Sequence, residues 1–147
     1  MASSRVQMKV EKFIRDNVLP AKYGRLFFAK TLKLKPGGQF CFDAVSEDGT
    51  IVANISTSSR FSPSGKGPGG KLQKLRADML FLLMTEAKHR LIVLTEKDMF
   101  ELCKTEENAG RTPVEIEFIL VDIPGDLREE LRKSKKVASD EVTPLKK

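Results

Sequence analysis

Aromatic, histidine and cysteine side chains are scarce in this chain of 147 residues. It has no tryptophan, one tyrosine, one histidine and two cysteines. So few cysteines argue against a disulfide framework or a thiolate metal site, and no Cys–His or Ser–His–Asp arrangement with a recognisable spacing can be assembled. The histidine, His89, lies at an expected helix-to-strand junction, where we interpret it as a helix C-terminal cap rather than a catalytic base.

Long apolar segments are also missing. No apolar run reaches the roughly 18 residues that span a bilayer. The first residues, Met1 to Arg5, are polar and charged and do not look like a secretory signal. We therefore expect no membrane contact and a cytoplasmic location. With 40% hydrophobic and 31% charged residues, the composition is typical of a globular protein, and the length fits one domain.

Positive charge is in excess, with 26 basic and 20 acidic side chains, a net charge of +6 and a pI near 9.4. Such a balance favours a polyanionic partner such as nucleic acid. The alternative is an ordinary solvated basic surface. Part of the excess lies near the C-terminus, at Lys133, Lys135, Lys136, Lys146 and Lys147.

The hydrophobic periodicity predicts alternating helices and strands. Ser3 or Ser4 is expected to cap the first helix and Pro20 to help end it, while the stretch from Thr95 to Asp98 resembles a capping box. A helix, a three-stranded meander and a helix–strand–helix–strand–helix run indicate an α/β fold with a mixed sheet flanked by helices. We expect a single domain over residues 1–135 and a polar, flexible tail over 136–147. The expected helices are 4–18, 70–88, 95–105 and 126–135, and the expected strands are 25–34, 39–45, 50–56, 91–94 and 114–123, with a mobile loop over 57–70.

The second and third strands form a predicted hairpin that carries three small polar residues. Asp43 lies on one strand, and Asn54 and Ser56 lie on the next. Because side chains alternate along a strand, Asn54 and Ser56 share one face, and both can meet Asp43 across the hairpin if the register agrees. One interpretation is that these groups simply satisfy one another's hydrogen bonds, with no ligand.

The element order and the hairpin together resemble the restriction-endonuclease-like, or PD-(D/E)XK, superfamily over roughly residues 5–123. The resemblance implies a mixed sheet of antiparallel and parallel strands, with an Asp on the second core strand and an acid-x-Lys pair on the next. Asp43 matches the first acid, which would be the metal ligand. Asn54 stands at the acid position and Ser56 at the lysine position. Glu11 falls where some members place an additional carboxylate.

The two replacements weaken the chemistry that the resemblance implies. Mg²⁺ normally takes one or two carboxylates, and serine cannot replace the lysine that positions and activates the attacking water. We therefore expect no cofactor, with Mg²⁺ only if the protein is active. In some members the lysine or acid has migrated, often to the following helix. Lys66, Lys71 and Lys74 are then candidates to act with Glu11 and Asp43, and the alternative is an ordinary solvated or phosphate-contacting face.

A glycine-rich segment, Gly65 to Lys71, matches the G-x4-G-K pattern of a phosphate-binding loop. Leu72 replaces the Ser or Thr that would hold Mg²⁺, and the loop is too long for that fold, which argues against nucleotide hydrolysis. Cations beside a helix N-terminus still favour phosphate contact, although a disordered connector is equally consistent with this composition. The candidate nucleic-acid-binding residues are Arg60, Lys66, Lys71, Lys74 and Arg76.

These observations lead to three hypotheses about function. The first is a nucleic-acid-associated domain whose metal site is degenerate and inactive. The second is an active Mg²⁺-dependent nuclease with migrated catalytic residues. The third is a non-catalytic interaction or scaffolding domain, for which a homodimer is one form.

Overall fold

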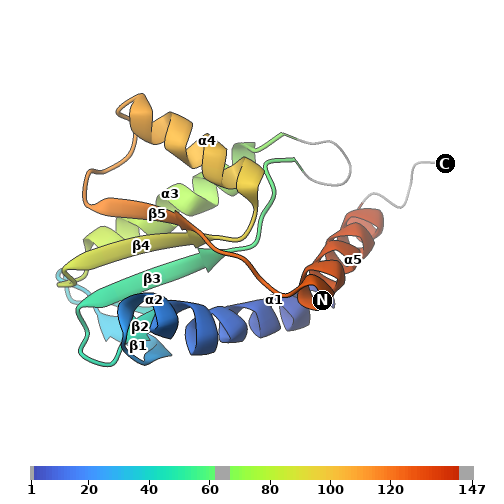
Figure 1. Ribbon diagram of the computed structural model, residues 1–147. Helices are drawn as coiled ribbons and strands as arrows, with labels where there is room; N and C mark the ends of the chain where they lie inside the picture. The colour runs from blue at the N-terminus through green and yellow to red at the C-terminus, as the bar shows by residue number, and fades with distance from the viewer. Residues whose placement is uncertain (1, 62–66, 143–147) are drawn as a thin grey trace.

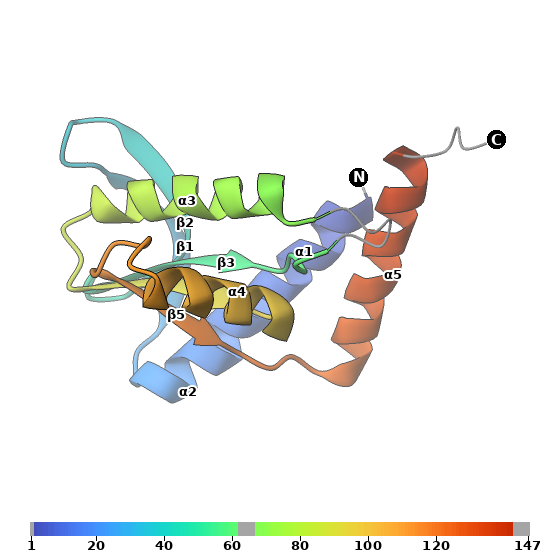
Figure 2. The same ribbon diagram turned by 90° about the horizontal axis from the view of Figure 1, so that it is seen from above.

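The computed structural model describes residues 2–61 and 67–142 and shows a five-stranded mixed sheet with helices on both faces (Figures 1 and 2). The expected α/β class and the mixed sheet are confirmed. The elements are α1 (Ala2–Phe13), the π-helical segment η1 (Ile14–Val18), α2 (Leu19–Tyr23), β1 (Phe27–Lys33), β2 (Gln39–Ser46), β3 (Ile51–Ser56), α3 (Gly69–Leu83), β4 (His89–Leu94), α4 (Lys97–Asn108), β5 (Ile116–Leu120) and α5 (Gly125–Val142).

The strands lie side by side in the order β1-β2-β3-β4-β5. The first three pair antiparallel, as a meander joined by short turns requires, and β3, β4 and β5 pair in parallel through the helical crossovers α3 and α4. The expected buried run over residues 91–94 is confirmed, because all four side chains are fully buried.

Two hydrophobic cores lie on the two faces of the sheet. On one face, α3 and α4 pack Leu75, Met79 and Met99 against the strands. On the other, α1 and α5 contribute Val10 and Leu131 to a second core. Both views place α5 beside the start of α1, at the side of the sheet toward which β3 and β4 point (Figures 1 and 2).

The first helical region is longer than predicted, and Pro20 does not end it. The chain is helical from Ala2, so neither Ser3 nor Ser4 is the cap, and it continues through η1 and α2 to Tyr23. Pro20 lies in the first turn of α2, directly after the π-helical segment η1. The region ends at Gly24, whose φ of 70° suits glycine.

The predicted role of His89 is wrong. Helix α3 ends at Leu83, and the carbonyl of Leu82 accepts hydrogen bonds from Thr85 Oγ1 (2.7 Å) and Arg90 Nε (2.9 Å). His89 instead starts β4, and its N–H donates to the carbonyl of Thr50 at 3.0 Å. The helix end is therefore capped by side chains that follow it in sequence.

Three other boundaries differ from the prediction. The capping box before α4 does not form, because the Thr95 hydroxyl donates to Glu96 Oε2 (2.8 Å) and Glu96 is the N-cap residue, without a side-chain cap bond. Strand β5 is shorter than expected, and Val114 is 95% exposed. Helix α5 continues to Val142, into the expected tail, and residues 143–147 lie outside the described ranges. No helix in those ranges has the length and apolar character to cross a membrane.

Candidate functional site

The candidate site lies where β2 and β3 separate. Regular pairing between these strands joins Ala44 to Ala53 and Val45 to Val52. Beyond these pairs, side chains make the cross-strand hydrogen bonds. The N–H of Asp43 donates to Asn54 Oδ1 at 3.3 Å, and the N–H of Ile55 donates to Asp43 Oδ2 at 2.8 Å. The expected meeting of Asp43 and Asn54 is confirmed, and both side chains replace backbone acceptors of the ladder.

A β-bulge in β2 explains how Asp43 reaches this position. Phe28 pairs with Val45 and Lys30 pairs with Phe42, so the single residue Ala29 of β1 faces both Asp43 and Ala44. A bulge turns the strand and redirects the side chains beside it. Asp43 is consequently placed where charged residues of both helical layers, α1 and α3, influence it.

The other two hairpin residues are engaged in structural contacts. Asn54 is 4% exposed, and its Nδ2 has no hydrogen-bond partner. Ser56 Oγ accepts a hydrogen bond from the N–H of Ser58 at 3.3 Å, so this hydroxyl group is engaged by its own chain segment. The hydroxyl that stands at the expected lysine position thus supports the turn after β3.

Glu11 of α1 and Asp78 of α3 lie close enough to Asp43 for their charges to interact. Burial raises the pKa of Asp43, although the Ile55 N–H and the charges of Lys74 and Arg15 oppose the shift. Burial also raises the pKa of Glu11 and of Asp78, and the charge of Asp43 raises both further. Three partly buried carboxyl groups therefore share one region.

Lys74 is the lysine of this region. Its Nζ lies 3.6 Å from Asp78 Oδ2, one helical turn away, and its charge lowers the pKa of Asp43 and of Glu11. Arg15 approaches from η1, and its Nη1 donates to the carbonyl of Asp43 at 3.0 Å. The structure thus brings together Glu11, Asp43 and Lys74 from the predicted residues and adds Asp78 and Arg15.

Sequence reasoning missed Asp78 because its place depends on tertiary packing. The signal in the sequence is an i,i+4 pair of Lys74 and Asp78 on one helix, which on its own is an ordinary surface ion pair. Only the packing of α3 against the sheet places this pair near β2. The side chain of Asp78 is consequently 13% exposed, whereas that of Lys74 is 74% exposed.

The remaining predicted basic residues are held in different local contacts. Lys71 Nζ donates to the carbonyl of Ser59 at 2.8 Å, and Arg76 Nη2 lies 3.1 Å from Glu106 Oε1. Arg60 stacks over the ring of Phe61, 5.6 Å from its centroid. Lys66 lies outside the described residues together with Gly65, whereas the rest of the glycine-rich segment is described and enters α3 at Gly69.

A groove of about 620 Å³ runs along α1 beside this region. Four cations of one helix face line it, together with Glu11, Met8 and Ala29, the residue opposite the bulge. Lys9 pairs with Glu130 and Lys12 pairs with Asp16, and all four of these side chains are substantially exposed. Such exposed pairs are weak, so an external anion can replace them. The cations are Arg5, Lys9, Lys12 and Arg15.

The carboxyl groups as placed do not form a magnesium site. Within residues 2–61 and 67–142, no three carboxylate, imidazole or thiolate side chains gather closely enough to hold a metal ion. One oxygen of Asp43 accepts the Ile55 N–H, and the Asn54 carbonyl accepts the Asp43 N–H. Since Mg²⁺ demands near-ideal octahedral oxygen ligation, these donors do not fit it in this arrangement.

Comparison with known proteins gives no match for this chain among protein families, curated proteins or solved structures.

Proposed function

We propose that this protein is a restriction-endonuclease-like domain that binds nucleic acid and has a degenerate, inactive metal site. The groove along α1 carries the proposal. Four cations line it, three from α1 at positions i, i+4 and i+7 and the fourth from η1, beside the β1 residue that faces Asp43. Positive side chains in a row neutralise successive phosphates and release their counterions.

The hydrogen bonds of the hairpin support the second half of the proposal. Asn54 accepts the Asp43 N–H, and Ser56 accepts the N–H of Ser58. Asn54, at the acid position, thus links the separating strands, and Ser56, at the lysine position, supports the turn after β3. In this proposal the hairpin keeps the polar residues of the former metal site because they form structural hydrogen bonds. The basic groove beside the hairpin supplies the affinity for phosphate.

The test is nucleic-acid binding measured by fluorescence anisotropy over a range of salt concentrations. We expect log affinity to fall linearly with log salt. The double variant Arg5→Gln, Lys12→Gln should weaken binding and make the slope for double-stranded DNA shallower by about two, because each lost phosphate contact removes roughly one counterion from the release.

A matched control removes the same charge elsewhere. Lys35 and Lys88 are exposed lysines outside the groove, and Lys35→Gln, Lys88→Gln should change the slope much less. Equal effects of the two double variants would refute the groove as the binding surface. Absence of binding by the wild-type protein at low salt would refute the function itself.

One observation favours a second candidate function, an active nuclease with migrated residues. Lys74 and Asp78 of α3 lie near Asp43 and Glu11, so an acid and a lysine are present in the neighbourhood. This function predicts Mg²⁺- or Mn²⁺-dependent cleavage that is lost in Asp43→Asn and in Lys74→Gln. Cleavage that survives in both variants would refute this site, and Lys35→Gln serves as the charge control.

A further inference from the structure

A crevice lies at the carboxyl ends of the parallel strands, away from the groove of α1. The connection after β4 leads to α4, on the face of α3, whereas the connection after β5 leads to α5, on the face of α1. Neighbouring parallel strands whose connections leave toward opposite faces create an opening between them, and ligands of α/β sheets commonly bind there.

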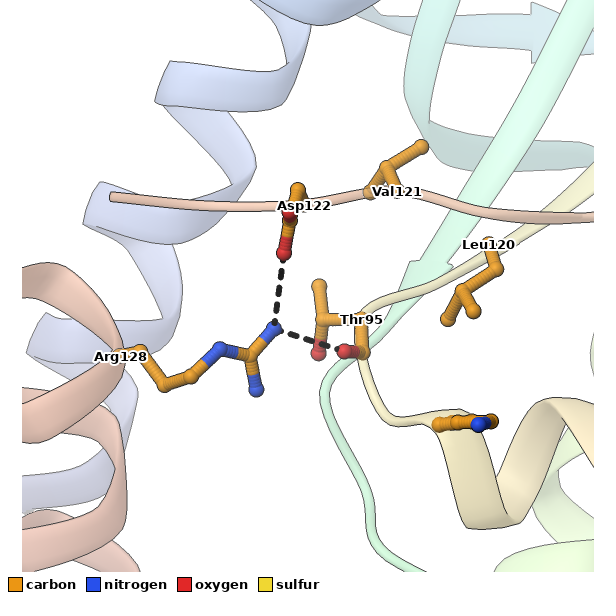
Figure 3. A pocket seen from close by; sticks show the side chains of 6 residues that line it. Thr95, Leu120, Val121, Asp122 and Arg128 are labelled. Carbon is orange, nitrogen blue, oxygen red and sulfur yellow. Dashed lines mark hydrogen bonds and ion pairs between the residues drawn. The ribbon is translucent and has the colours of Figure 1, made fainter. Parts of the chain in front are cut away.

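Two hollows make up this crevice and share Arg128 as a wall. The first, of about 420 Å³, is lined by Thr95, Lys97, Leu120, Val121, Asp122 and Arg128 (Figure 3). The second, of about 300 Å³, is lined by residues of α5, the N-cap Glu96 and the chain after β3. Arg128 is fixed between the hollows, because it donates to the carbonyl of Thr95 at 2.9 Å and to Glu96 Oε2 at 3.0 Å.

Cations from two distant parts of the chain converge beside the second hollow. Lys71 of α3 donates to the carbonyl of Ser59 at 2.8 Å, and Lys135 of α5 donates to Ser59 Oγ at 3.3 Å. Burial lowers the pKa of Lys135, and the charge of Lys71 lowers it further, while Glu96 partly offsets both. An anion at this place would remove the repulsion between the two lysines.

An aromatic ring and an aliphatic side chain line the same hollow. Phe61 lines it while remaining 53% exposed, whereas Leu131 lines it from α5 with only 3% of its surface exposed. An exposed aromatic face binds nucleobases by stacking, with little dependence on which base is bound. The hollow thus combines a place for a ring with cations for a phosphate.

We propose that this crevice binds a nucleoside monophosphate group, with its base against Phe61 and its phosphate beside Lys135 and Arg132. The site goes beyond the proposed function, since it lies outside the groove of α1. A free nucleotide and the phosphorylated end of a nucleic-acid strand present this same chemistry.

The test is calorimetric titration of the full-length protein with AMP, with adenosine and with inorganic phosphate as separate probes. AMP should bind more tightly than either fragment. Phe61→Ala should weaken AMP binding by about ten-fold, as loss of base stacking does, and Lys135→Gln should weaken it while leaving adenosine binding unchanged.

Matched controls lie outside the crevice. Phe28, on β1, is 51% exposed, and Lys133, on α5, is exposed and does not line the hollow. Phe28→Ala and Lys133→Gln should bind AMP as the wild type does. No binding of AMP by the wild type, or unchanged affinity in both Phe61→Ala and Lys135→Gln, would overturn the proposal.

Two further probes separate the sources of the ligand. The probes are a dinucleotide with a 5′-phosphate and the same dinucleotide without the phosphate. Competition with AMP by the phosphorylated form alone would assign the site to a strand end. Competition by neither would assign it to a free nucleotide. Because Arg5→Gln, Lys12→Gln leaves the crevice intact, it should bind AMP normally, and this result separates failure of the groove from failure of the crevice.

Discussion

At the scale of single residues, the carboxyl group of Asp43 acts as a hydrogen-bond acceptor for the backbone. Its Oδ2 accepts the N–H of Ile55 at the point where β2 and β3 separate, so this donor is satisfied without a regular ladder. Burial makes the charged form of Asp43 costly, and the charge of Asp43 in turn raises the pKa of Glu11 and of Asp78.

Two substitutions separate the hydrogen bond from the charge. Asp43→Ala removes the acceptor and leaves a backbone donor without a partner, so we expect a lower free energy of unfolding by about 1–3 kcal/mol. Asp43→Asn keeps an acceptor oxygen and removes the charge, so it should be at least as stable as the wild type near neutral pH. Urea unfolding measures both.

The dependence on pH provides a second measurement for the same pair. A carboxyl group whose folded pKa is raised costs stability increasingly as pH rises from the ordinary pKa of aspartate through the raised value. Asp43→Asn should therefore gain stability relative to the wild type across that window. If Asp43→Asn instead loses as much stability as Asp43→Ala at every pH, the hydrogen bond needs the ionised group.

At the scale of elements, Glu106 connects α4 to α3 and to the chain after α4. It is 8% exposed, and its carboxylate accepts hydrogen bonds from Arg111 Nε (2.9 Å), Arg111 Nη2 (2.8 Å) and Arg76 Nη2 (3.1 Å). The hydrogen bonds and the charge of Arg111, followed by those of Arg76, lower the pKa of Glu106 to about 2. A single carboxylate therefore fixes the packing of two helices on one face of the sheet.

Glu106→Gln should destabilise the protein at neutral pH. Because the folded pKa is depressed, the ionised group contributes stability above its ordinary pKa of 4.5, and this contribution is lost as pH falls toward about 2. The difference between wild type and variant should therefore shrink over that window. Urea unfolding at neutral and acidic pH measures it.

The neighbouring residue offers the control for this prediction. Glu107 forms an i,i+3 surface pair with Lys104, which is a weak type of interaction, and Glu107→Gln should change stability little at any pH. If Glu106→Gln loses the same amount of stability at every pH, the shape of the side chain and not its charge holds the two arginines.

At the scale of the whole molecule, α5 completes the hydrophobic core on the face of the sheet that α1 covers. Leu131 is 3% exposed and packs in the same core as Val10 of α1, and Lys9 of α1 pairs with Glu130 of α5 at 3.1 Å. The first and last helices thus pack together at one end of the sheet (Figure 2).

Leu131→Ala should lower the free energy of unfolding by about 2–5 kcal/mol, the usual cost of a cavity in place of a buried leucine. Leu80 of α3 is 52% exposed, and Leu80→Ala should cost far less. Hydrogen exchange should show the loss of protection first in α5 and α1, where the cavity opens. Equal losses in the two variants would mean that α5 contributes little to the core.

Much of the fold could be predicted from local sequence. Periodicity predicted every strand of the sheet, because alternating or continuous apolar residues reflect which strand faces are buried. The meeting of Asp43 with Asn54 was predicted on condition that the register agreed, and the cross-strand hydrogen bond meets that condition. Ser56 instead accepts a hydrogen bond from its own chain. The helix ends were predicted less well. One of the two side chains that cap α3, that of Arg90, reaches back from β4 to the carbonyl of Leu82, and the local pattern does not indicate this contact.

The sequence by itself determined the order of elements, the mixed sheet and the polar hairpin, because these depend on neighbours along the chain. The tertiary structure decided which charges meet. It placed Asp78 and Glu11 near Asp43, aligned the cations of α1 over a groove, and brought Lys71 and Lys135 to one serine. The physical reason is that a helix presents its polar residues on a surface that only its packing against the sheet can orient.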